Sequence, residues 1–145
     1  STLARSSAAS DVYKRQALEV AVTDFAKGTR DAEDAPDLAS AISSIVESWR
    51  QVLLHSDFTA GCPIAAFVVD ACESDPLREQ AHERFTRWRT AVARIHRRFG
   101  YDRAAAWDEA ALIISALEGA ALVARAGRSI EPLDAVERLL VDRVR

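Results

Sequence analysis

The stretch "HSDFTAGCPIAAFVVDACESDP", residues 55–76, holds both cysteines of the chain together with a histidine and several acids. These are the side chains that bind zinc, so a metal centre is the first chemistry to test. His55, Asp57, Cys62 and Cys72 show neither a CxxC nor an HxxxH spacing, however. We therefore predict no metal site and no cofactor.

The two cysteines are also poorly placed for a disulfide. Cys62 and Cys72 lie ten residues apart, which is about 15 Å along a helix, whereas a disulfide needs Cα atoms within about 7 Å. Cys72 is predicted to be a small buried apolar residue. Cys62 precedes a helix that begins near Pro63, where the helix dipole favours a reactive thiolate. One interpretation is a redox or electrophile sensor; we favour a thiol that only packs or caps.

Patterns typical of enzymes are missing from the sequence. It has no GxSxG, no glycine-rich phosphate loop and no Cys–His pair in a catalytic context. Glu47 and Asp70 could serve as acids in a cleft, but nothing pairs them. We predict no catalytic residue; a small helical enzyme would require a convergent cluster of ionisable groups.

Eight arginines lie between Arg78 and Arg103, opposed there only by Glu79, Glu83 and Asp102. They indicate either an anionic partner, such as DNA phosphate, or the polar face of an amphipathic helix. We favour the polar face, because the whole chain has 19 basic and 22 acidic residues and a net charge of −3. The histidines of this region, His82 and His96, are predicted to be solvated.

The composition indicates one domain, since 145 residues with 49% apolar content can form a real core. No apolar stretch looks long enough to span a bilayer, and no signal peptide is visible, so we expect a reducing, cytoplasmic location and no membrane. Residues 1–16 show no apolar period and are predicted to be a disordered or non-native leader. Residues 17–145 form the domain.

The remaining sequence predicts an all-α bundle of about six helices. The expected segments are residues 17–27 with Gly28 as C-cap, a helix opened by Pro36, an apolar helix after Gly61, a helix from Asp75 to about Gly100, residues 103–126, and a last helix capped by Ser129.

The third segment is apolar nearly all round, and although a strand is conceivable, the lack of alternation favours a buried helix. The fifth must be covered on two sides, and Gly119 in its middle suggests a close helix approach.

The motif series resembles a known family. "SDFTAGCPIAAFVVDACESDPLREQAHERFTRWRTAVA" is similar to the C-terminal domain of TetR-type transcriptional regulators of the LmrA/YxaF-like branch, with its GCP turn, acidic turn and tryptophan helix. "ALIISALEGAALVARAGRSIEPLDAVERLL" resembles the last two helices of that branch. The resemblance covers roughly residues 17–145.

That resemblance implies a homodimer in which the last two helices pack against those of a partner as a four-helix bundle. The residues expected at this interface are Leu117, Gly119, Ala120, Leu133, Val136 and Leu140. It also implies a pocket for a small, mostly apolar effector, whose binding releases the repressor from DNA. The residues expected to line the pocket are Trp49, His55, Cys62, Phe67, Phe85, Trp88, Trp107 and Glu118.

One feature departs from the family pattern. The DNA-reading helix-turn-helix head should precede Ala17, and only sixteen residues do so here. We therefore expect this chain to dimerise and bind a ligand without reading DNA, as a truncated DNA-binding protein would. The alternative is a helical dimerisation module with a filled core and no ligand pocket, because small residues such as Ala65 and Ala120 fit close packing as well as a cavity.

Overall fold

The computed structural model describes residue 25, residues 27–71 and residues 75–145. A first helical segment covers 27–33. It is followed by α2 (Leu38–His55), α3 (Pro63–Ala71), α4 (Asp75–Arg98), α5 (Arg103–Gly127) and α6 (Glu131–Asp142). No strand occurs in these residues. The all-α fold class is confirmed.

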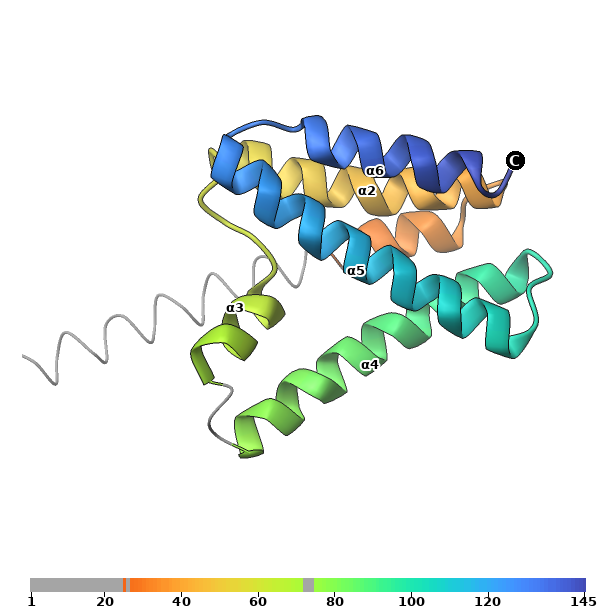
Figure 1. Ribbon diagram of the computed structural model, residues 1–145. Coiled ribbons are helices and arrows are strands. Elements are labelled where there is room, and N and C mark those ends of the chain that lie inside the picture. Colours follow the sequence, from red (N-terminus) through yellow and green to blue (C-terminus); the bar gives the residue numbers. More distant parts are fainter. Residues whose placement is uncertain (1–24, 26, 72–74) are drawn as a thin grey trace, which may run out of the picture.

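The helices form a packed half and a more open half (Figure 1). α2, α5 and α6 lie beside one another, and α4 packs along part of α5. α3 packs against α4. Cys72, the predicted leader 1–16 and most of the predicted helix 17–27 lie outside the described part of the chain, so these predictions stay predictions.

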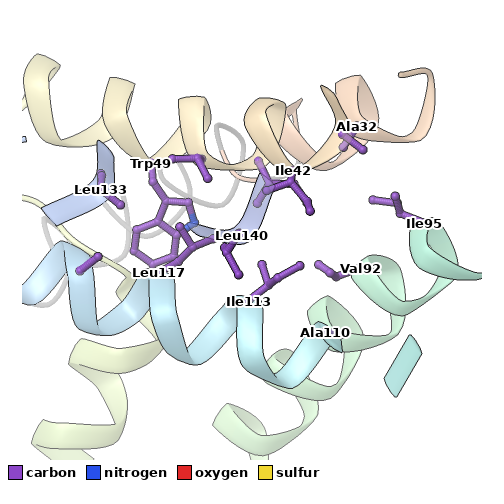
Figure 2. Packing of buried hydrophobic residues seen from close by; sticks show 14 of the residues in the cluster. Ala32, Ile42, Trp49, Val92, Ile95, Ala110, Ile113, Leu117, Leu133 and Leu140 are labelled. Carbon is purple, nitrogen blue, oxygen red and sulfur yellow. The ribbon is translucent and has the colours of Figure 1, made fainter. Parts of the chain in front are cut away.

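Apolar residues that recur at helical spacing along α2 contribute to the core. Leu38, Ile42, Ile45, Trp49 and Val52 are all buried, and Trp49 is only 1% exposed. Figure 2 shows Trp49 beside Leu117 and Leu140, with Ile113, Val92 and Ile95 continuing the core toward α4. Arg50 also joins α2 to α6 at the surface, since its guanidinium lies 2.8 Å from Asp134 and 2.7 Å from Glu137.

Two helix boundaries differ from the prediction. Gly28 is not a C-cap, because residues 27–33 are helical through it. A Cβ at this position would lie 2.4 Å from Ser48 Cβ, so the glycine permits a close crossing with α2. Pro36 does not open α2 either. The helix begins at Leu38, and Asp37 caps it by accepting a 2.7 Å hydrogen bond from the Ser40 backbone N–H.

The caps of the last two helices are also local in origin. Asp102 caps α5 by accepting from the backbone N–H of Ala105 at 2.8 Å. α5 ends at Gly127, and the left-handed position after it is taken by Arg128, with a φ of 49°. Ser129 does not occupy the N-cap of α6, which is Ile130, although its Oγ accepts from the Glu131 N–H at 3.3 Å.

Two burial predictions are wrong. α3 is not a buried helix, since Val69 is 77% exposed and Val68 36%. His96 is not solvated: it is 1% exposed, its Nδ1 lies 3.0 Å from the Val92 carbonyl oxygen, and its ring meets Tyr101 edge to face. His96 is buried because it shares a face of α4 with Val92 and Ala93, which lie four and three residues earlier and are themselves buried.

Candidate functional site

An aromatic cluster joins three helical segments. Phe25 is helical and directly precedes the segment 27–33, and its ring centroid is 4.6 Å from that of Trp49 on α2. Trp49 stacks on Trp88 of α4 at 5.7 Å, and Trp88 stacks on Phe85 at 6.4 Å. The indole nitrogens of Trp49 and Trp88 are buried and find no hydrogen-bond partner among the described residues. The cluster is therefore apolar but carries two unused donors.

A pocket of about 440 Å³ opens beside this cluster. Phe25, Ile64 and Trp88 supply apolar surface to it. Its other lining residues are Thr29, Arg30, Glu33, Cys62, Pro63, Arg84, Arg87, Ala91 and Arg94. A volume of this order, with aromatic walls and a few polar groups, is typical of a small-molecule site.

Cys62, which is buried, lines this pocket and also a second groove. That groove, about 480 Å³, runs between α3 and α5 past Glu118, Gly119 and Leu122. Burial, and then the nearby Glu118 carboxyl, raise the pKa of the Cys62 thiol far above its ordinary value. Burial likewise raises the pKa of Glu118. The protonated thiol favours the packing interpretation of Cys62 over the reactive-thiolate interpretation.

Four of the residues expected to bind a ligand come together: Trp49, Phe85, Trp88 and Cys62 lie in or beside the aromatic pocket. Glu118 adjoins Cys62 on the other side. His55 lies elsewhere, exposed in a polar groove with Glu47, Arg50 and Glu137.

Two further aromatic residues expected in the pocket lie apart from the cluster. Phe67 is partly buried on α3. Trp107 is 36% exposed, with the Arg89 guanidinium 4.0 Å from its ring centroid. Trp107 does not line the aromatic pocket, and its role in ligand binding stays a prediction. α5 turns that residue toward the polar face of α4, where the indole ring and the cation stack.

The residues expected at a dimer interface also divide into two groups. Leu117, Ala120, Leu133 and Leu140 are at most 6% exposed within their own chain. Their side chains fill the core of their own chain, and their place at an interface stays a prediction. Gly119 is exposed and Val136 is partly buried.

An exposed stripe on α5, here called the outer side, was missed. It consists of Leu112, Ser115, Gly119, Leu122 and Ala126, which are all exposed. Val123 next to it is 59% exposed. The spacing of three, four, three and four residues is helical, so the sequence held the signal. Because nearly every position of α5 is apolar, periodicity alone could not say which stripe faces inward.

The arginines at the pocket mouth were missed as site residues as well. Arg84 and Arg87 were assigned to a solvated helix face, yet they line the pocket with Trp88. Arg30 falls between the predicted helix 17–27 and the predicted helix at Pro36, whereas the structure places it in the helical segment 27–33. The density of arginines after Arg78 was the available signal. Their position relative to α3 and the first segment depends on packing.

The histidine, acid and cysteine of residues 55–62 do not converge. Asp57 forms an ion pair with Arg128 at 2.7 Å, and Cys62 is buried beside Glu118. Within the part of the chain that the structure describes, no three His, Cys, Asp or Glu side chains lie close enough to hold a metal ion.

The structure corrects the expectation that no apolar stretch is long enough to span a bilayer. By length and composition this helix could cross a membrane, and it is the one such helix among the described residues. The bounds of α5, Arg103–Gly127, agree with the predicted residues 103–126 to within one residue, but Glu118 and Arg125 interrupt its apolar run. α5 packs against α2, α4 and α6, and a core helix has the same composition.

The comparisons with known proteins agree with this architecture. Residues 38–139 match the family described as transcriptional regulator LmrA/YxaF-like, C-terminal domain. The chain is also 36% identical over 131 residues to an uncharacterized HTH-type transcriptional regulator of Mycobacterium tuberculosis, found in strains CDC 1551 and H37Rv. The match covers 86% of this chain and 66% of the relative's length. No solved structure matches. The chain therefore belongs to the TetR-type transcriptional regulators of the LmrA/YxaF-like branch, and residues 38–139 are its C-terminal regulatory domain.

Proposed function

We propose that this chain is the effector-binding and dimerisation domain of a small-molecule-responsive TetR-type repressor. The observation that carries the proposal is the 440 Å³ aromatic pocket, which lies between three helical segments of a regulatory domain. A small, mostly apolar molecule would contact Trp88, Phe25 and Ile64 there. Such a cavity favours a sensor over the alternative of a dimerisation module with a filled core.

The partner in this proposal is a second copy of the chain. The outer side of α5 exposes Leu112, Leu122 and Val123, and Leu139 of α6 is 62% exposed. Exposed apolar groups of this size on neighbouring helices are typical of an interface. A two-fold axis near Gly119 would let the outer sides of two α5 helices cover each other, since such an interface is self-complementary. The family resemblance favours this occupant.

Coupling between pocket and interface would run through Cys62 and Glu118. Cys62 lines both the pocket and the groove between α3 and α5, and Glu118 adjoins it on the helix that carries the outer side. A ligand that changes how α3 packs would shift the pairing of two copies and hence the paired helix-turn-helix heads in the cytoplasm. The relatives' name indicates such a head, which in this proposal belongs to the full-length regulator.

A thermal-shift screen of the chain against small aromatic compounds tests the pocket. A compound that binds the folded state raises the melting temperature as its concentration exceeds its Kd. The Trp88→Ala variant should lose that shift. Trp107→Ala is the matched control, because Trp107 lies beside Arg89 outside the pocket, and it should keep the shift. A shift that survives Trp88→Ala and fails in Trp107→Ala would contradict the proposed site.

A further inference from the structure

The mouth of the aromatic pocket is strongly basic. Four arginines line it, from the first helical segment and from α4: Arg30, Arg84, Arg87 and Arg94. Glu33 is the one acidic residue that lines it among the described residues. This local charge runs against the net charge of −3 of the whole chain. A cleft lined mainly by one sign of charge raises the local concentration of ligands with the opposite charge.

The single acid at the mouth is already engaged. Arg94 forms an ion pair with the Glu33 carboxylate, and Arg98 donates to the Glu33 backbone carbonyl. Arg30, Arg84 and Arg87 form no ion pair with any residue that the structure describes. Within the described part of the chain, these three arginines therefore line the pocket beside Phe25 and Trp88 without an acidic partner.

Cys62, which also lines the pocket, is buried, and burial raises the pKa of its thiol far above the ordinary value. Burial also raises the pKa of the neighbouring Glu118 carboxyl, which does not line this pocket. α3 begins at Pro63, so its N-terminal end, where the helix dipole is positive, also borders the pocket. The Trp88 indole N–H, buried and without a partner among the described residues, is a further donor beside the apolar wall.

We propose that the effector is an organic anion with an aromatic or similarly flat apolar body, held by the pocket arginines Arg84, Arg87 and Arg30. The apolar body packs against Trp88 and Phe25, and the carboxylate, sulfonate or phosphate lies at the mouth. This inference rests on the proposed function and specifies its ligand class. Arginine suits the role because its planar fork donates two parallel hydrogen bonds to such an anion.

A pair of fluorescent probes separates charge from apolar contact. 1-Anilinonaphthalene-8-sulfonate and N-phenyl-1-naphthylamine share one aromatic skeleton, and the first carries the sulfonate. The 145-residue chain should bind the anionic probe about five-fold more tightly than the neutral one, since partly exposed guanidinium contacts are worth only a few-fold each. The preference should shrink as salt is raised.

The matched variants are Arg84→Gln/Arg87→Gln and Arg97→Gln/Arg103→Gln. Both remove two positive charges, but Arg97 and Arg103 line a different groove, with Trp107. The first variant should lower affinity for the anionic probe about five-fold and leave the neutral probe within about two-fold of wild type. The second should change neither. All four side chains are exposed, so folding should survive.

These measurements distinguish a failure of the anionic ligand class from a failure of the proposed pocket. If both probes bind equally, and Trp88→Ala removes the binding of both, the pocket stands and the anionic ligand class is overturned. The anionic class is also overturned if the two arginine pairs lower anion affinity equally, because that effect is general charge. If neither probe binds, the proposed pocket falls and the anion inference falls with it.

Discussion

The two sides of α5 have similar composition and opposite surroundings. On the inner side Ile113, Leu117 and Ala124 are at most 1% exposed. On the outer side Leu122 is 67% exposed and Val123 is 59%. The inner side is covered by α2, α4 and α6 of the same chain. Within the described part of this chain, the same apolar composition therefore meets the core on one side of α5 and solvent on the other.

Removing a large side chain from the inner side should have the largest effect on stability. Leu117→Ala should lower the free energy of unfolding by about 3 kcal/mol, because it leaves a cavity where the leucine is 0% exposed. Leu122→Ala, the outer-side control, should change the unfolding of the dissociated chain by about 0.5 kcal/mol or less. Urea unfolding at low protein concentration measures both. Equal losses in the free energy of unfolding for Leu117→Ala and Leu122→Ala would contradict the assignment of an inner and an outer side to α5.

Gly28 is buried where residues 27–33 cross α2, and replacing it should lower the free energy of unfolding nearly as much as Leu117→Ala. Gly28→Ala should destabilise the chain by about 2 kcal/mol, because the added Cβ would lie 2.4 Å from Ser48 Cβ and the helices must separate. Thermal or urea unfolding gives the loss. A stabilised Gly28→Ala protein would show that the segment 27–33 does not cross α2 this closely.

The sequence predicted the helix stripes well and the helix surroundings poorly. Leu38, Ile42 and Trp49 recur at helical spacing, and a stripe flanked by polar residues can face only the core. No such contrast exists on α3 or α5. Tertiary packing, and not the sequence pattern, therefore decides which side of α5 faces inward and whether Val69 is exposed.

The pocket was partly predictable for the same reason. Trp49 lies on the apolar stripe of α2, and Phe85 and Trp88 lie on that of α4, so the helix pattern predicts that all three face inward. Phe25 and Arg30 join them because the first helix continues through Gly28, which sequence rules treat as a stop. A glycine that ends a helix and one that permits a crossing look alike without their neighbours.

Glu118 lies at the boundary between the two sides and should give a smaller, pH-dependent effect. Burial raises its folded-state pKa above the ordinary 4.5. Its contribution to stability is therefore complete below pH 4.5 and is lost as the pH rises through the folded pKa. Glu118→Gln should stabilise the chain at about pH 7 by about 1 kcal/mol and by nothing at about pH 4. Unfolding curves at the two pH values measure this, and a pH-independent change would contradict the assigned cause.

Gly119 on the outer side should give the smallest change. An added Cβ meets nothing within 4 Å in the single chain. Gly119→Ala should therefore stabilise the dissociated chain by about 0.5–1 kcal/mol through helix propensity. In the paired state the gain should shrink, because a methyl group there meets the partner helix. Unfolding measured at two protein concentrations tests both parts; an equal gain at both would remove Gly119 from the proposed crossing point.

Sedimentation velocity over a range of protein concentrations tests most directly whether a second copy covers the outer side of α5. The chain should sediment as a dimer, and Leu122→Glu/Val123→Glu should sediment as a folded monomer, because the charges would be buried in the interface. Leu54→Glu, at a 49% exposed site on α2, should remain dimeric. A wild-type monomer at all concentrations, or a dimer unaffected by the α5 charges, would contradict the proposed interface.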